Sequence, residues 1–513
     1  MEENYWTYDE YFIFKSDFDE PIDDFIGIVK NYSKLIFSDY DNLESVVKIY
    51  IDPNSNKELT RKIDWNFGSS FNLDLGNNFS SLTNLTELTF GYEFNQPLPY
   101  NFSSLVNLTQ LTFGYMYNII LPEKFSSLTN LTQLTFGYMY NKPLPDNFVN
   151  LTNLTSITFG YRFNQPINDI LKHLIKLKQL TFGYSFNQQL SDGLEKLIEL
   201  EVLIFPCNYK KPLGTSLDKL LNLKKLYLGL NYLSESANIF NKFSKLEKLK
   251  LGHDFTQPLD NLLNNCIELR VLTLGASFNH PLANSLFQLI NLTHLTFDYY
   301  FDQPLANSLD KLINLVYLSF GYYFDKPLAN SLDKLINLVY LSFGDRFNKP
   351  LSNSLDNLIN LTQITFRKSF NQPLTNSLSN LIKLKKIIFG DDFSQPLTNS
   401  LSNLLNLEEL TLGKNFNKDL LFIPNIKILT LNCNNQNIID SLPNSIEQLN
   451  LGFDFNLPLD NLPNSIKKIS FSEHNKFRQK LNNLPRSLEI LKLNFDYNDE
   501  ILNKPPNCKI VYL

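Results

Sequence analysis

The sequence predicts a repeat solenoid of mixed α/β class, with one long curved parallel β-sheet whose strands are joined by short helical or extended return segments. An aromatic residue recurs every 23 residues through most of the 513-residue chain, and each copy has the same order of apolar and polar positions around it. A fixed period of roughly 20–50 residues is the signature of solenoids and other repeat arrays. The recurring aromatic residues are Phe71, Phe94, Tyr117, Tyr140, Phe163, Phe186, Tyr209, Tyr232, Phe255, Phe278, Phe301, Phe324, Phe347, Phe370, Phe393 and Phe416.

The strand of the repeat is represented by the unit Leu85–Asn107. Leu88 and Phe90 flank Thr89, and this alternation with a period of two predicts a strand. The residues equivalent to Phe90 are always Phe or Leu, so we expect this column to face the core. The residues equivalent to Thr89 include Lys250, so that column should face water. Stacked strands should lie about 4.8 Å apart in a parallel sheet.

The turn and the return segment follow the strand. Phe94 and Leu98 should point inward, with Pro97 fixing the turn between them. Asn95 and its equivalents should form a ladder of buried amides that satisfy backbone groups of the turns. The return segment should be a short helical turn, as in Ser308–Leu312, which is stable only when it is docked on the stack.

Three parts of the chain differ in repeat spacing. Residues 1–70 hold degenerate N-terminal repeats with a polar insertion at 51–62, residues 71–420 hold regular 23-residue repeats, and residues 421–513 hold shorter repeats of 19–22 residues that end on a strand. Prolines in the last part favour extended return segments. The final strand should leave an open sheet edge, and open edges favour pairing. We therefore expect an end-to-end contact through the C-terminal edge strand as one mode of association.

Composition and charge exclude several classes of partner. The net charge is -6 and no long basic run is present, so a nucleic-acid partner is not expected. The first residues do not read as a signal peptide, and no apolar run is long enough to span a membrane. The four cysteines form no C-x-x-C pair, which argues against structural zinc and against a disulfide framework. These features predict a soluble, intracellular protein without a membrane partner.

The sequence contains no motif that indicates an enzyme. Its five histidines form no H-E-x-x-H, and its glycines form neither a phosphate-binding loop nor a nucleophile elbow. We therefore expect no catalytic site, no cofactor and no metal. Asn-x-Thr triplets such as Asn84-Leu85-Thr86 are frequent, but they arise because the repeat unit itself contains Asn-Leu-Thr.

The repeat unit resembles leucine-rich repeats in its spaced strand leucines, its asparagine ladder and its short return. The aromatic motif Phe-Asn-x-Pro-Leu is more specific and resembles the FNIP-repeat family, which is known from amoebae and from the large viruses that infect them. The third position holds Gln, Lys or His, and Leu in the copy at Phe455, where that family has Ile, and we expect no consequence for the fold. The motif begins at Phe94, Phe278, Phe347, Phe370 and Phe455, and Phe163 begins the close variant Phe-Asn-Gln-Pro-Ile.

The resemblance implies a leucine-rich-repeat-like solenoid and, for a viral protein, a location in the host cytoplasm. Some family members carry an N-terminal F-box, which links them to ubiquitin ligases. Residues 1–70 show no apolar three-helix pattern of that kind.

The leading hypothesis is a non-enzymatic protein–protein interaction scaffold that presents its sheet face. The alternative is a substrate-binding subunit or adaptor linked to a ubiquitin ligase, although no F-box is recognisable. A third hypothesis is a purely structural repeat protein without a dedicated partner. In the unit Leu85–Asn107, only Glu87, Thr89, Tyr92 and Glu93 are free to carry function.

Tyrosines are the candidate protein-binding residues, because Tyr offers a large contact area at low entropic cost and is enriched at interface hot spots. The bland alternative is that these tyrosines only cover the ends of the strands. One column follows the strand glycine and contains Tyr92, Tyr115, Tyr138, Tyr161 and Tyr184. The densest group, which we rank first as an interface, contains Tyr299, Tyr300, Tyr317, Tyr322, Tyr323, Tyr340 and Arg346.

Overall fold

The computed structural model describes residues 4–40, 42–46, 70–213, 215–229, 239–397, 400–420, 425–497, 499, 501 and 503–512. The predicted polar insertion at 51–62 and the repeat aromatic Tyr232 lie outside these described residues. The chain forms two compact units, unit 1 (Met1–His253) and unit 2 (Asp254–Leu513).

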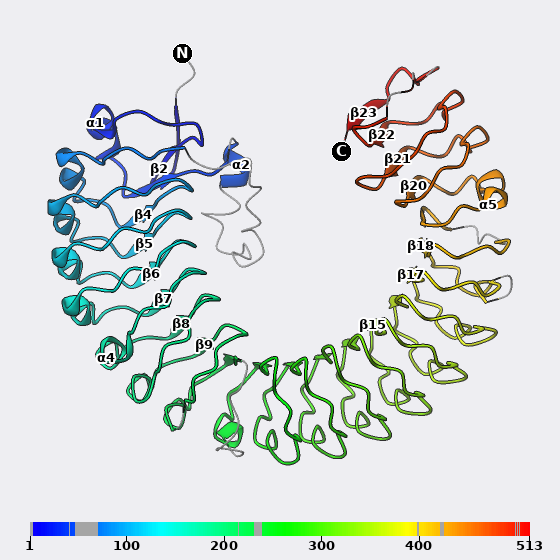
Figure 1. Ribbon diagram of the computed structural model, residues 1–513, viewed down its shortest axis with the longest axis horizontal. Coiled ribbons are helices and arrows are strands. Elements are labelled where there is room, and N and C mark those ends of the chain that lie inside the picture. The colour runs from blue at the N-terminus through cyan, green and yellow to red at the C-terminus, as the bar shows by residue number, and fades with distance from the viewer. Residues whose placement is uncertain are drawn as a thin grey trace. The chain divides into compact units, whose positions relative to one another are not determined.

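Short strands at repeat spacing build both units (Figure 1). The strands of unit 1 are β1 (Tyr5–Tyr8), β2 (Tyr11–Phe14), β3 (Lys34–Phe37), β4 (Glu87–Thr89), β5 (Gln110–Thr112), β6 (Gln133–Thr135), β7 (Ser156–Thr158), β8 (Gln179–Thr181), β9 (Val202–Ile204), β10 (Lys225–Tyr227) and β11 (Lys248–Lys250). Those of unit 2 are β12 (Val271–Thr273), β13 (His294–Thr296), β14 (Tyr317–Ser319), β15 (Tyr340–Ser342), β16 (Gln363–Thr365), β17 (Lys386–Ile388), β18 (Glu409–Leu412), β19 (Ile428–Leu431), β20 (Gln448–Leu451), β21 (Lys468–Phe471), β22 (Ile490–Leu493) and β23 (Lys509–Tyr512).

The strands pair in parallel and in register, as the repeat predicts. Leu88 in β4 lies opposite Leu111 in β5, and Leu318 in β14 lies opposite Leu341 in β15. At the start of unit 1, β2 pairs in parallel with β3, and β3 pairs with β4 across the insertion. The degenerate N-terminal repeats therefore belong to the stack. The exception is β1, which pairs with β2 in antiparallel orientation.

Two columns of aromatic side chains fill the core beneath the sheet. Phe90 and Phe94 are buried, and their rings stack with centroids 4.1 Å apart. Phe94 in turn lies 6.0 Å from Tyr117 of the next repeat. The inward columns predicted from the sequence are confirmed. The Thr89 column is half-buried or exposed, except for Ser342, which is fully buried.

Short helices form most return segments of unit 1, whereas turns form its return segments at 191–196 and 215–219 and most of those of unit 2. Unit 1 uses the short 3-10 helices η3 (Asn77–Ser81), η4 (Tyr100–Ser104), η5 (Glu123–Ser127) and η6 (Asp146–Asn150) and the helix α4 (Asn168–Leu171). The remaining helices are η1 (Ile22–Asp24), α1 (Ile26–Val29), α2 (Leu43–Val46) and η7 (Ile239–Lys242) in unit 1 and α5 (Gln436–Asp440) in unit 2.

The helical turn predicted for Ser308–Leu312 is wrong, because this segment forms a series of separate turns. Ala306, which precedes it, has a left-handed backbone with φ of 44°. The amide of Leu312 then donates to the carbonyl of Leu309 at 2.9 Å. Both leucines are nevertheless fully buried, as predicted. The side-chain pattern fixed which residues point inward, and the backbone conformation followed from the tight return path.

The asparagine ladder predicted at the turns is confirmed, although its amides are half-buried or exposed rather than buried. The amide N–H of Asn95 donates to Oδ1 of Asn72 at 2.8 Å, and the N–H of Asn118 donates to Oδ1 of Asn95 at 2.8 Å. In unit 2 the carboxylate of Asp302 takes the acceptor role for the N–H of Asp325 at 2.9 Å.

The third position of the aromatic motif contributes to the same ladder, contrary to our expectation that it has no consequence for the fold. Nε2 of Gln303 donates to Oδ1 of Asn279 at 3.0 Å. Where the acceptor is the carboxylate of Asp302, the third-position residue of the next repeat is Lys326, and its Nζ lies 2.7 Å from Oδ2. The anionic rungs Asp302 and Asp325 are thus each matched by a cation, Lys326 and Lys349, and the neutral rung Asn279 is matched by an amide.

Candidate protein-binding surfaces

The ladder tyrosines of unit 1, defined as Tyr92, Tyr115, Tyr138, Tyr161 and Tyr184, form one continuous stack. Neighbouring ring centroids are 4.4–4.8 Å apart, and neighbouring ring planes differ by 7–10°. The exposed fraction of the side chain rises along the stack to 45% at Tyr184. The structure therefore brings all five predicted residues of this column together at the surface.

The backbone beneath the ladder tyrosines is fixed by hydrogen bonds to the neighbouring repeats. The N–H of Met116 donates to the carbonyl of Tyr92 at 2.9 Å, and the same bond joins Met139 to Tyr115. At the first rung, the N–H of Tyr92 donates to Oδ1 of Asp39 at 2.7 Å. Asp39 therefore anchors the start of the stack.

A groove of about 260 Å³ runs beside the ladder tyrosines. The strand threonines Thr112 and Thr158 and the glycines that end the strands form part of its lining. The Gly114 position must lack a side chain, because a Cβ there would overlap the carbonyl of Gly91. The groove combines hydroxyl groups, glycine backbone and tyrosine rings, and its lining includes Asp39 and Tyr40 near the first rungs.

The hydroxyls of Tyr92 and Tyr115 keep their protons at neutral pH. Burial raises the pKa of Tyr92, and the nearby carboxylates of Glu93 and Asp39 raise it further. The pKa of Tyr115 is also raised, first by burial and then by its neighbours Tyr138 and Tyr92. These groups offer neutral hydroxyls rather than phenolates to a ligand.

The unit-2 tyrosine cluster, defined as Tyr299, Tyr300, Tyr322, Tyr323 and Arg346, forms a second aromatic surface. Tyr299 stacks on Tyr322 at 4.9 Å, and Tyr300 stacks on Tyr323 at 5.1 Å. The guanidinium carbon of Arg346 lies 4.2 Å from the centroid of the Tyr323 ring, in cation–π geometry. Burial and the neighbouring tyrosines raise the pKa of Tyr299. These five residues lie in the turns that follow the strands.

Tyr317 and Tyr340, which we grouped with that cluster, lie instead on the strands β14 and β15. Their rings stack at 4.4 Å with only 2° between the planes, and His294 extends the stack at 5.5 Å from Tyr317. The predicted patch is therefore two separate stacks, because the side chains belong to different columns of the repeat. Burial raises the pKa of Tyr317.

Two exposed aromatic residues in the C-terminal repeats were missed by the sequence reasoning. Phe453 is 46% exposed and lies beneath Nζ of Lys476 at 5.4 Å. Phe495 is 78% exposed and contacts Tyr512 edge-on at 6.3 Å. Both residues hold the position equivalent to Tyr92, so counting from the end of each strand would have found them.

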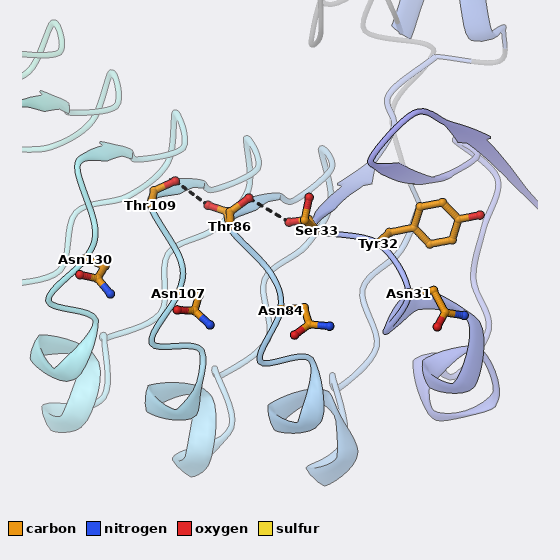
Figure 2. A pocket seen from close by; sticks show the side chains of 8 residues that line it. All are labelled: Asn31, Tyr32, Ser33, Asn84, Thr86, Asn107, Thr109 and Asn130. Atoms are coloured by element: carbon orange, nitrogen blue, oxygen red, sulfur yellow. Dashed lines mark hydrogen bonds between the residues drawn. The ribbon is translucent and has the colours of Figure 1, made fainter.

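A polar groove lies on the flank of unit 1, where the return segments lead into the strands (Figure 2). Nδ2 of Asn107 donates to the carbonyl of Thr83 at 2.9 Å, and Oγ1 of Thr109 donates to the carbonyl of Thr86 at 2.9 Å. The Asn and Thr of each Asn-Leu-Thr segment thus bond to the preceding repeat. This explains the frequent Asn-x-Thr triplets as structural elements.

Within the described residues, no group of three or more His, Cys, Asp or Glu side chains is placed to hold a metal ion. The same part of the chain contains no helix that is long and apolar enough to cross a membrane. None of the four cysteines forms a disulfide bond, and only Cys207 among them is exposed. Burial raises the pKa of Cys266 to about 12.

Solved structures with the same architecture support the solenoid fold. CroV588, a circular LRR protein from a giant virus, is 23% identical with a TM-score of 0.60, over 99% of this chain and 80% of that chain. The Leptospira interrogans LRR protein LIC12759 is 18% identical with a TM-score of 0.52, over 80% of this chain and 98% of that one. TLR13 in its complex with ssRNA13 is 17% identical with a TM-score of 0.52, and the match covers 80% of this chain and 66% of that one. At these identities the likeness shows the fold alone.

Family comparisons identify the repeats themselves. A search among curated protein sequences gives no match. The FNIP repeat family matches residues 434–474. The BspA type leucine rich repeat region matches residues 75–178, 199–311 and 329–419, which together exceed half of the chain. Proteins with such leucine-rich repeats generally serve protein–protein interaction. The chain therefore belongs to the BspA-type leucine-rich-repeat family and carries FNIP repeats.

Proposed function

We propose that this protein is a non-enzymatic interaction scaffold that binds a partner protein with the ladder tyrosines and the groove beside them. The observation that carries the proposal is the continuous stack of five surface tyrosines, of which Tyr115, Tyr138 and Tyr161 line the groove. Tyrosine is enriched at binding hot spots, where it supplies area and a hydroxyl.

Pre-organisation favours binding at this surface. Each ring of the stack is held between its neighbours, so little side-chain entropy remains to be lost when a partner docks. The threonine hydroxyls and glycine backbone of the groove offer hydrogen-bonding groups to an extended segment of the partner. The unit-2 tyrosine cluster is a second, smaller contact surface in the same proposal.

Affinity purification from the native cell with quantitative mass spectrometry tests this function. The test variant replaces three rungs, Tyr138→Ser, Tyr161→Ser and Tyr184→Ser. The matched control is Tyr100→Ser, because Tyr100 is 74% exposed but lies on the return helix η4. We expect recurrent partners of the wild type to fall at least about tenfold for the test variant, a loss of about 1.4 kcal/mol in binding.

The control variant should retain those partners, and circular dichroism should show both variants to be folded. Unchanged recovery with the folded test variant would refute the tyrosine surface. A third variant, with Tyr299→Ser, Tyr300→Ser and Tyr323→Ser, separates the contribution of unit 2.

The same purification bears on the finer functional alternatives. Recovery of ubiquitin-ligase subunits with the wild type would support the adaptor role that the family resemblance implies. The absence of any recurrent partner would favour a purely structural repeat protein. An intracellular setting is part of our proposal, and it is supported by the lack of a disulfide bond among Cys207, Cys266, Cys433 and Cys508.

A further inference from the structure

A stripe of exposed aliphatic side chains runs along unit 2 at one residue per repeat. Each member is 49–60% exposed, although Ile and Leu are usually among the most buried residue types. We call these residues the aliphatic stripe. Its seven members are Ile267, Ile290, Ile313, Ile336, Ile359, Ile382 and Leu405.

The fold does not require aliphatic side chains at this position. In unit 1 the same column holds threonine at Thr83 and Thr129 and exposed aliphatic residues at Val106, Ile175, Ile198 and Leu221, so it accepts both kinds of side chain. The carbonyl of Thr83 accepts a hydrogen bond from Nδ2 of Asn107 at 2.9 Å. In unit 2 the carbonyl of Ile290 accepts the same bond from Asn314 at 2.9 Å. The backbone carbonyl therefore accepts the same hydrogen bond whether the side chain is polar, as in Thr83, or apolar, as in Ile290. Only the exposed side chain differs.

Other exposed columns of the same seven repeats are not uniformly apolar. The column after the strand glycine changes from Tyr322 to Asp345 and then to Lys368 in three successive repeats. The column two residues before the stripe is polar and exposed throughout, and the asparagine column borders the other side. The stripe is therefore an apolar band between two polar borders, which is the anatomy of a protein interface.

We propose that the aliphatic stripe is a self-association surface that packs against the same stripe of a second copy of this chain. A second copy of this chain presents aliphatic side chains at the same spacing, so it can match the stripe along its whole length. Two-fold symmetry then makes the surface self-complementary, as in most homodimers.

The direction of the two stripes follows from the spacing of the repeats. Tyr317 and Tyr340 on the sheet face lie 4.4 Å apart, whereas the core rings of Phe324 and Phe347 lie 6.0 Å apart. Successive repeats therefore fan out from the sheet face, and the stripe bends with them. A bent stripe matches its copy only when the copy runs in the opposite direction.

This antiparallel arrangement fixes the pairs across the interface. The central member, Ile336, lies on the two-fold axis and faces its own equivalent in the second copy. Ile267 faces Leu405, and Ile313 faces Ile359. Seven half-exposed aliphatic side chains provide on the order of 600 Å² of apolar surface per copy, at the upper limit for an ordinary monomer surface. A standard interface buries about 800 Å² per partner, so the stripe would supply most of the area that such an interface needs.

Sedimentation equilibrium of the full chain tests the proposal. We expect a concentration-dependent dimer for the wild type. The variant Ile313→Thr, Ile336→Thr, Ile359→Thr imitates the threonines of unit 1 and should raise the dimer Kd at least about 100-fold. The matched control is Ile175→Thr, Ile198→Thr, Leu221→Thr, which alters the same column in unit 1 at the same exposure of 50–56%. It should leave the dimer Kd unchanged.

Disulfide trapping tests the symmetry, in a Cys207→Ser background that removes the exposed native thiol. Ile336→Cys should cross-link with itself. Ile267→Cys and Leu405→Cys should cross-link when the two proteins are mixed, but neither should do so alone.

Several results would overturn the proposal. The first is a wild type that stays monomeric at all concentrations up to about 100 µM, because interfaces of this size associate at such concentrations. The second is a dimer that persists in the stripe variant. The third is a disulfide between two copies of Ile267→Cys when Ile336→Cys forms none with itself. Stripe-dependent binding to lipid vesicles by a monomeric wild type would also overturn it, because the occupant would then be a membrane.

Discussion

Two tyrosines in the core of unit 1 should destabilise the repeats that contain them. Tyr117 and Tyr140 occupy the aromatic column that holds Phe94 and Phe163 in the flanking repeats, and both are fully buried. Neither hydroxyl has a hydrogen-bond partner among the described residues. Burying a hydroxyl without a partner costs about 1–3 kcal/mol. The variants Tyr117→Phe and Tyr140→Phe should each stabilise their repeat by that amount.

The same substitution should have the opposite effect at Tyr209, which makes it a matched control. Tyr209 belongs to the same column, is 3% exposed, and donates its hydroxyl to the carbonyl of Gln188 at 3.2 Å. Tyr209→Phe removes this hydrogen bond and leaves the carbonyl of Gln188 without the hydroxyl donor, so it should destabilise its repeat by about 0.5–1.5 kcal/mol.

Hydrogen exchange is the appropriate assay, because long repeat arrays do not unfold as a single two-state unit. A gain of 1.4 kcal/mol should slow amide exchange in β5 and β6 about tenfold. Unchanged or faster exchange in Tyr117→Phe and Tyr140→Phe would refute the reasoning. A stabilising effect of Tyr209→Phe would also refute it. The change in stability on removal of a hydroxyl would then not depend on whether that hydroxyl has a hydrogen-bond partner.

Three further predictions address pH, the turn ladder and the return segments. Burial raises the pKa of Tyr117 and Tyr140 in the folded state, so the unfolded chain releases those protons first as pH rises above about 10, and folding stability falls there. Alkaline unfolding followed by circular dichroism should therefore begin at higher pH in the double Phe variant, and an unchanged onset would contradict this. Lys326→Gln or Asp302→Asn alone should each cost about 0.5–1 kcal/mol by breaking the surface pair, whereas the double variant should recreate the Asn–Gln rung and recover stability in a double-mutant cycle. Ala306→Gly should stabilise its repeat by about 0.5 kcal/mol, since glycine accepts the positive φ of this turn without steric cost, and faster exchange in the variant would argue against strain at this residue.

The columns of the repeat could be predicted from the sequence because each column is sampled many times. A position that is Phe or Leu in every copy, such as that of Phe90, must be buried whatever the details of the backbone. The Asn95 ladder was predictable for the same reason. Iteration averages out the exceptions that make a single strand or turn hard to assign.

The tyrosine surfaces could be predicted only in part. The stack from Tyr92 to Tyr184 follows from one column of the repeat and was found. The group around Tyr299 was treated as one patch because its members are dense in the sequence. Tyr317 and Tyr340 lie on the strands, however, while Tyr299 and Tyr322 lie in the turns, so sequence density did not imply contact in space.

The sequence by itself determined the repeat, the inward columns and the family to which the chain belongs. Only the tertiary structure decided which apolar residues stay exposed. In Leu312-Ile313-Asn314-Leu315, periodicity alone gives Ile313 the same claim to the core as its neighbours. The turns that start at the left-handed Ala306 bring Leu312 and Leu315 inward and leave Ile313 52% exposed. Backbone conformation in the return segment, which hydrophobicity does not encode, therefore decided where the aliphatic stripe lies.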